Sequence, residues 1–211
     1  MLYWKDDDDL EYCKFYGDGR YRPTRGRAPH RKKSPYAVPR YLSLTPRLQR
    51  LYSLRATAEH MKWHATHMTA EGSICHPSDV EAWKHFDRMY PDFVEEPRNV
   101  RLGLCIDGFA PQGQYGRTYS CWLVIITPYN LPTGMCMSSK YMFFTMVIPS
   151  PSNPKRLIDV YLEPLIEELL QLWHVGVRTY DHTTDQAFMM RAALMWIMND
   201  HRGYGMSDLY G

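Results

Sequence analysis

Two aspartates stand where the sequence could hold a metal ion. Asp107 follows the apolar segment 100–106, and Asp200 ends the apolar run 187–199. Carboxylate oxygens are the ligands that hard cations such as Mg²⁺ prefer. Two such ions can activate a water or a 3′-hydroxyl and stabilise the leaving oxygen in phosphoryl transfer. The pair therefore predicts nuclease or strand-transfer chemistry, provided that the fold brings both carboxylates to one edge of a sheet.

Each aspartate has an alternative interpretation. Asp107 precedes Gly108, and an Asp-Gly pair after a strand is also ordinary turn chemistry, because the backbone can turn tightly there. Asp181 competes with Asp200 for the second position, although it comes before the last apolar run and not after it. These alternatives are decided by where the strands run.

The elements that would position the aspartates follow in the second half of the chain. Alternation or apolar content predicts strands over 100–107, 119–127 and 141–148. A helix should follow, with Pro164 in its first turn, Leu162 and Leu165 on its apolar face, and an end near Gly176. Periodicity does not separate helix from strand over 187–199, and we interpret this run as a strand buried on both faces. Strand, strand, strand, helix, strand is the order of the ribonuclease H type fold, an α/β (α+β) arrangement. A right-handed helical crossover would make the last strand parallel to the first.

The first half of the chain predicts helices and an extended arm. A helix should begin at Thr45, able to cap, and Pro46, and continue to Met61, and a second should span 77–90 with Ser78 as its cap. Residues 14–50 contain eleven Lys and Arg against one acidic residue, which suggests contact with a polyanion. The predicted nucleic-acid-binding residues are Arg20, Arg22, Arg25, Arg27, Arg31, Lys32 and Lys33. A solvated, disordered segment that aids nuclear import explains the composition equally well.

Cysteines and histidines give little sign of a metal site. The five cysteines are odd in number and form no CxxC pair, so neither a disulfide framework nor a zinc site is expected. His60, His64 and His67 have helical spacing, but no third ligand of known geometry accompanies them, and a structural role is favoured. The start of the chain is acidic and no run of eighteen apolar residues occurs, so neither secretion nor membrane insertion is expected.

Several dispersed strings closely resemble the plant CACTA (En/Spm-type) DNA transposase family. They occur in one order from about Tyr12 to about Asp200, nearly the whole chain. The strings are Thr45-Pro-Arg-Leu-Gln-Arg-Leu-Tyr52, Met61-Lys-Trp-His64, His76-Pro-Ser-Asp79, Ala82-Trp-Lys84, Pro97-Arg-Asn-Val-Arg-Leu-Gly-Leu104, Asp107-Gly-Phe109, Tyr129-Asn-Leu-Pro132, Leu162-Glu-Pro-Leu165, Leu172-Trp173 followed by Gly176-Val177, and Arg191-Ala192.

The resemblance implies a cut-and-paste transposase with a ribonuclease H type catalytic domain and three acidic ligands for Mg²⁺ or Mn²⁺. Asp107 matches the first ligand, in the family's Asp-Gly-Phe motif, and Asp200 matches the second. The third acid lies well downstream in the family and has no counterpart in these 211 residues. The resemblance also implies DNA, in particular transposon ends, a possible transposase or accessory-protein partner, no membrane, and a location in the nucleus.

Positions at which the sequence differs from the family's motifs indicate lost function. Tyr16 stands where the family commonly has the second Cys of a Cys-x-x-Cys-Gly string, so Cys13 is expected to bind no zinc. Leu123 replaces a Pro, and the segment after Asp200 differs from the family. We therefore expect an arm over 1–44, a helical region over 45–98 and a truncated, inactive catalytic domain over 99–211. A non-catalytic module that binds DNA or a partner is the alternative.

Overall fold

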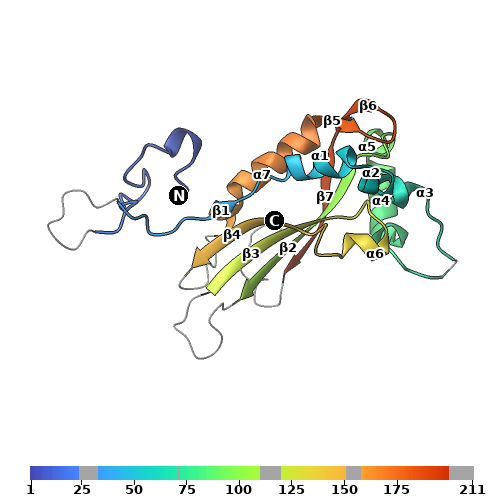
Figure 1. Ribbon diagram of the computed structural model, residues 1–211. Coiled ribbons are helices and arrows are strands. Elements are labelled where there is room, and N and C mark those ends of the chain that lie inside the picture. Colours follow the sequence, from blue (N-terminus) through green and yellow to red (C-terminus); the bar gives the residue numbers. More distant parts are fainter. Residues whose placement is uncertain (24–32, 71, 110–119, 151–157, 200–211) are drawn as a thin grey trace.

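A five-stranded mixed sheet organises the molecule (Figure 1). The computed structural model describes residues 1–23, 33–70, 72–109, 120–150 and 158–199. The strand order is β1-β4-β3-β2-β7, and the strands are β1 Arg40–Tyr41, β2 Val100–Phe109, β3 Ser120–Pro128, β4 Phe143–Ser150 and β7 Ala192–Asn199. β2, β3 and β4 pair antiparallel, and β7 pairs with β2 in parallel. The α+β class and the parallel return of the last strand are confirmed.

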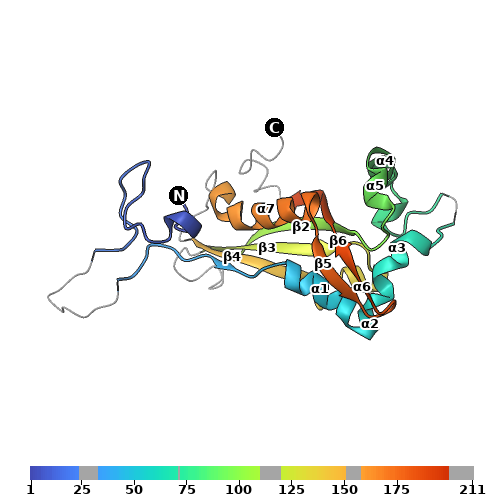
Figure 2. The same cartoon turned by 90° about the horizontal axis from the view of Figure 1, so that it is seen from above.

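Helices α1 and α7 lie over one face of this sheet (Figures 1 and 2). Alternate strand residues such as Leu104, Val124 and Ile148 form a core with Leu48 and Leu165 from these helices. The described helices are α1 Thr45–Ser53, α2 Arg55–Ala58, α3 Trp63–Thr66, α4 Glu81–Met89, α5 Pro91–Val94, α6 Thr133–Cys136 and α7 Ile158–His174, with 3₁₀ turns η1 Lys5–Asp7, η2 His60–Lys62 and η3 Pro77–Asp79. No helix in the described part of the chain is long and apolar enough to cross a membrane.

The start of α1 is capped from a distant part of the chain. Thr45 was the predicted cap, but the N-cap residue is Leu44, which makes no side-chain cap hydrogen bond. The Glu168 carboxylate of α7 instead accepts hydrogen bonds from the Leu44 and Thr45 backbone N–H groups, at 2.9 and 2.8 Å, and from Ser43 Oγ at 2.6 Å. Burial opposes ionisation of this carboxyl, yet these donors outweigh it and lower the pKa of Glu168.

Other predicted helix boundaries were wrong. The helix that begins at Thr45 stops at Ser53, because Leu54 has an extended backbone, and short helical turns follow up to Thr66. Ser78 lies within η3, and α4 starts after Val80. Pro164 lies inside α7, which begins six residues earlier at Ile158. The predicted stop is confirmed, since Gly176 follows the helix with a φ of 79°.

The apolar run 187–199 is two strands and not one. β6 (Gln186–Met190) pairs with β5 (Val177–Asp181) in a hairpin that the sequence analysis did not predict, and β7 starts after Arg191. Arg191 leaves both ladders because its backbone N–H donates to Asn99 Oδ1, and its guanidinium Nε donates to the Trp173 carbonyl. The hairpin packs beside α1, and β7 enters the main sheet.

The N-terminal segment has backbone structure where an extended arm was expected. Tyr12 pairs with Gly19 and Tyr21 with Pro35, both antiparallel, and β1 adds two residues to the edge of the main sheet beside β4. The predicted domain limits remain predictions. Asp200 and residues 24–32 lie outside the described residues.

Candidate functional site

Asp107 is exposed near the end of β2, inside the strand and not at its exit. The strand continues through Gly108 to Phe109, so the expected tight turn after Asp107 is absent from this described strand. Gly108 has a packing reason instead: a Cβ at this position would lie 2.9 Å from Trp122 Cζ2. The Asp-Gly pair is therefore not a turn, and the alternative interpretation of Asp107 as turn chemistry is wrong.

The side chain of Asp107 belongs to the face of the sheet opposite α1 and α7. Leu104 and Ile106 point into the core, so the alternation of a strand puts Cys105 and Asp107 on the other face, where Asp107 is paired with Leu123 of β3. Burial, followed by the nearby charge of Asp107, raises the pKa of the Cys105 thiol. Asp107 thus combines an exposed carboxylate with a partly apolar surface.

The parallel pairing of β2 with β7 approaches the second predicted ligand. Its last pair joins Ile106 and Asn199, one residue before Asp107 and one residue before Asp200. Asp200 itself lies outside the described residues. No group of three or more His, Cys, Asp or Glu side chains able to hold a metal ion occurs in the described part.

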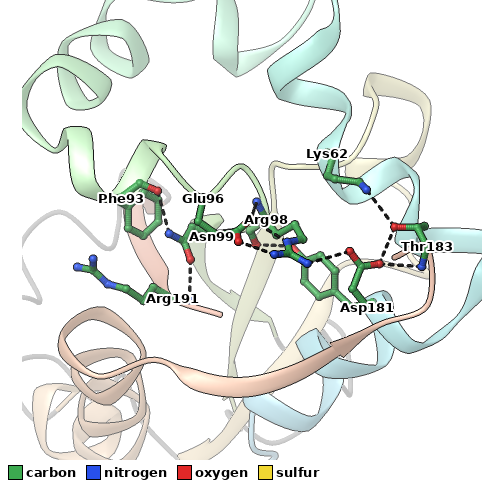
Figure 3. Close-up of polar contacts among 9 residues, drawn as sticks. Lys62, Phe93, Glu96, Arg98, Asn99, Asp181, Thr183 and Arg191 are labelled. Atoms are coloured by element: carbon green, nitrogen blue, oxygen red, sulfur yellow. Dashed lines mark hydrogen bonds and ion pairs between the residues drawn. The ribbon is translucent and has the colours of Figure 1, made fainter. Parts of the chain in front are cut away.

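Asp181, the alternative second ligand, lies at the other end of β2. It ends β5 fully buried and accepts hydrogen bonds from Thr183 N, Thr183 Oγ1 and Arg98 Nη1 at 2.9, 2.7 and 3.3 Å (Figure 3). Arg98 precedes β2, and the strand rises about 23 Å between Val100 and Asp107. Asp181 therefore cannot share a metal ion with Asp107, and its role is to anchor the β5–β6 hairpin.

The same end of β2 contains a continuous polar network (Figure 3). Glu96 receives two hydrogen bonds from the Arg98 guanidinium, at 2.6 and 2.7 Å, and Arg98 also lies 4.0 Å from the Phe188 ring centroid. Asn99 donates to the Phe93 carbonyl at 2.8 Å and accepts from Arg191 N at 2.8 Å. The Pro97 to Leu104 string thus joins the helical region, the hairpin and the sheet.

Arg101 is the largest fully buried side chain of this network, at 2% exposure. Its guanidinium lies 4.7 Å from the Trp83 ring, donates to Asp87 Oδ1 at 2.7 Å, and lies 3.0 Å from His64 Nε2. Burial and then the Arg101 charge lower the pKa of His64 to about 3. An arginine in an alternating strand gave no sequence signal for this burial.

Histidines near Arg101 are hydrogen-bonded to protein groups, and His67 and His76 share Ser78 Oγ as a neighbour, at 3.4 and 2.8 Å. His67 Nε2 lies 3.0 Å from Asp79 Oδ1, and His76 Nδ1 accepts from Ser78 N at 3.1 Å. Asp79 also accepts from the Cys75 and His76 backbone N–H groups at 2.9 Å. Asp79 thereby fixes the loop before α4, and the structural interpretation of His64 and His67 agrees with these contacts.

The predicted nucleic-acid-binding residues are only partly described. Arg20 donates to the Asp8 and Leu10 carbonyls, Arg22 donates to the Tyr36 carbonyl at 3.0 Å, and Lys33 forms an exposed ion pair with Glu11. Arg25, Arg27, Arg31 and Lys32 lie outside the described residues. The described cations belong to a folded segment and not to a free arm.

Comparison with known proteins identifies the larger part of the chain. The model of a family described as "Transposase family tnp2" matches residues 71–209, which include β2, β7 and Asp107. No curated protein and no solved structure matches.

Proposed function

The chain belongs to the transposase family tnp2, and from that premise we propose that the β2–β7 edge is the metal-binding edge of a cut-and-paste DNA transposase of the plant CACTA type. Asp107 and Asp200 are the proposed catalytic residues and metal ligands, within a ribonuclease H type catalytic domain. The nucleus is the proposed location, because the substrate is chromosomal DNA.

One observation carries the proposal: the parallel register of β2 and β7 ends on the pair Ile106 and Asn199. Residues opposite each other on neighbouring strands face the same side, and the strands lie about 4.8 Å apart. Extended by one residue, this register would put the Asp107 and Asp200 carboxylates side by side. That spacing allows both to bind one hard cation.

Mg²⁺ or Mn²⁺ is the cation that fits these ligands. Asp107 offers exposed hard oxygen atoms, whereas the zinc-binding alternative at Cys13 has Tyr16 in place of a second thiolate. When bound, the ion would activate the attacking hydroxyl for phosphoryl transfer. The part played by Asp107 and Asp200 is to hold the ion at the exposed edge of the sheet.

Two ligands alone make a weak site. The resemblance assigns Asp107 and Asp200 within the 211 residues, and the family uses a third acid downstream. We therefore expect these residues by themselves to bind Mn²⁺ weakly and to leave DNA uncut.

Binding is tested by titrating the chain with Mn²⁺ and measuring free Mn²⁺ by electron paramagnetic resonance. Asp107→Asn and Asp200→Asn should each weaken binding by at least about tenfold, since removing even an outer-shell partner of a metal costs that much. Asp92→Asn, an exposed aspartate of α5, is the matched control. Equal Mn²⁺ binding by Asp107→Asn and the unmodified chain would contradict the site.

Cleavage is tested separately on supercoiled plasmid with Mg²⁺ or Mn²⁺. Intact plasmid is the expected result. Nicking that disappears in Asp107→Asn would show that two ligands suffice for DNA cleavage. It would overturn the proposal that the chain leaves DNA uncut, and it would support the assignment of Asp107 as a ligand.

A second candidate function is a DNA-binding module without catalysis. The observation that favours it is the charge of residues 20–40, which contain eight Lys and Arg and no acidic residue. Replacing Arg25, Arg27, Arg31, Lys32 and Lys33 by Ala should abolish DNA retention in a low-salt filter assay. Unchanged retention would count against this function.

A further inference from the structure

Large apolar side chains are exposed on the face of the main sheet opposite α1 and α7 (Figure 1). Phe109 of β2, Phe144 of β4 and Met198 of β7 are 42%, 48% and 43% exposed. Single exposed apolar residues are normal, whereas a continuous group of them marks an interaction surface. The strand register decides whether these three belong together, because residues opposite each other on neighbouring strands point to the same side of the sheet.

A row of uncharged side chains crosses four strands on this face. Cys105 of β2 lies opposite Met198 of β7 on one side and opposite Ile125 of β3 on the other. Ile125 in turn lies opposite Phe144 of β4. A similar row near the end of β2 consists of Phe109, Cys121 and Pro149. The exposed side chains from β2, β4 and β7 therefore belong to one surface.

The row between these two has a charge at each end. It consists of Asp107, Leu123, Val147 and Arg40, on β2, β3, β4 and β1 in that order. Both ends are exposed, and neither forms an ion pair with another residue of the described ranges. At about 4.8 Å per strand, the Asp107 and Arg40 backbones lie about 14 Å apart, too far for a direct ion pair. We call the three rows together the open face.

The order of the two charges makes the open face complementary to a copy of itself. A second copy can be turned by 180° about an axis that runs along the strands between Leu123 and Val147. Asp107 of each copy then faces Arg40 of the other, and Leu123 faces Val147. Packed sheets lie about 10 Å apart, a gap that an aspartate and an arginine side chain span together. A two-fold interface of this kind, with the same patch on both subunits, is the commonest arrangement in assemblies of identical chains.

Other partners match the open face less well. One acid and one base leave its three rows without net charge, which disfavours a strongly acidic or basic protein, and a single cation offers little to a phosphate backbone. We propose that the open face is the interface of a two-fold dimer of this chain. The inference goes beyond the proposed function and gives Asp107 a second ligand, because Arg40 of the other copy competes with a metal ion for the same carboxylate.

The test is sedimentation equilibrium of the whole chain in a series of concentrations up to roughly 100 μM, since an interface of this size is expected to be weak. The mass should rise from that of one chain to that of two. Asp107→Arg and Arg40→Asp should each raise the dimer Kd at least about tenfold, because like charges then face each other at two equivalent contacts. The double variant restores opposite charges in the reverse order and should recover most of the affinity.

Controls separate the open face from other surfaces and from folding. Phe144→Asp places a charge inside the interface and should also raise the Kd at least about tenfold. Met189→Asp changes a strand residue that is 51% exposed on β6, outside the open face, and should leave the Kd unchanged. All variants should keep the Tm of the unmodified chain. The dimer is refuted if the chain stays monomeric throughout the series, if Phe144→Asp associates normally, or if the double variant recovers no affinity.

A further variant keeps this inference distinct from the metal site proposed above. Asp107→Asn retains an acceptor for the guanidinium of Arg40, so it should raise the dimer Kd less than Asp107→Arg does, while weakening Mn²⁺ binding. A dimer that forms in a chain unable to bind Mn²⁺ would leave this inference standing and remove the metal site. A chain that binds Mn²⁺ through Asp107 but stays monomeric would do the reverse.

Discussion

Polar residues at the two ends of strand β2 differ in burial. At the start, Arg98, Asn99 and Arg101 are buried or half-buried. Arg98 is hydrogen-bonded to Glu96 and Asp181, Arg101 to Asp87, and the Asn99 side chain to the Phe93 carbonyl. Near the end, Asp107 is exposed beside Cys105 and Leu123. Loss of one partner in a buried polar network leaves the other without a hydrogen bond and lowers the stability of the fold, so the residues at the start of β2 have a structural role. An exposed carboxylate, in contrast, is available to a ligand. Motif residues on a single strand therefore have separate roles.

The largest effect on stability should come from Arg101→Ala. The substitution removes a buried guanidinium from Trp83 and His64 and leaves Asp87 without its partner. The free energy of unfolding should fall by about 3 kcal/mol or more. Urea denaturation measures it, with Arg88→Ala as control, because Arg88 forms an exposed pair with Glu81 and should cost at most about 1 kcal/mol. Equal losses would mean that the start of β2 is not a stabilising network.

Asp181→Asn should have the next largest effect. It removes a buried charge that accepts from Thr183 and Arg98, and should cost about 2 kcal/mol. Mn²⁺ binding by the folded variant should be unchanged. A loss of Mn²⁺ binding without a loss of stability would reverse the roles assigned to Asp181 and Asp107.

Acid should weaken the same end of the molecule. His64 has its pKa lowered to about 3, against about 6.5 in an unfolded chain, and burial lowers the pKa of His76 too. The unfolded chain therefore binds more protons between these values, and stability falls as pH drops below 6.5, by up to about 1.4 kcal/mol per pH unit for His64. Unfolding measured from pH 7 to 5 checks this.

A variant identifies the group responsible. His64→Gln should flatten the stability profile between pH 6.5 and 5 by that slope. If the slope persists in this variant, another group titrates in the window and His64 does not control the acid response.

Asp107→Asn should have the smallest effect on stability. The side chain is exposed, so the free energy of unfolding should change by less than about 0.5 kcal/mol. Its effect belongs to Mn²⁺ binding instead. A large loss of stability in thermal unfolding would show that Asp107 has a structural role, and the two ends of β2 would then not differ in function.

The sequence predicted the strands of the main sheet better than it predicted the cap of α1 and the β5–β6 hairpin. Alternation in 100–107 and the order of the segments sufficed to predict the antiparallel strands and the parallel return of the last strand. Alternation is a property of each segment alone, and the crossover follows a general rule of handedness. The predicted cap at Thr45 was wrong because the group that accepts hydrogen bonds from the start of α1 is Glu168, more than 120 residues away in the sequence. The β5–β6 hairpin was missed because Arg191 interrupts an otherwise continuous apolar run through bonds to Asn99 and Trp173.

The candidate site was predictable in part for the same reason. Asp107 could be assigned to the strand from its apolar neighbours, but its position inside β2 follows from the contact between Gly108 and Trp122, which no local pattern reports. The burial of Arg101 was invisible because it depends on Trp83 and Asp87, brought by a different element. The ligand role of Asp200 stays a prediction.

A single residue in β7 sets the phase of the edge where the ions would bind. Leu102 pairs with Leu194 but Gly103 pairs with Trp196, so Met195 is an extra residue in the ladder. If the ladder ran through Met195 without this irregularity, every later residue of β7 would lie one place further along β2 and face the opposite side of the sheet. Asn199 would then lie opposite Asp107 and not Ile106. The irregularity at Met195 is therefore a spacer that sets the phase of β7, on which the proposed sharing of one ion by two distant carboxylates depends, and one residue inserted after Trp196 would break that phase without touching either carboxylate.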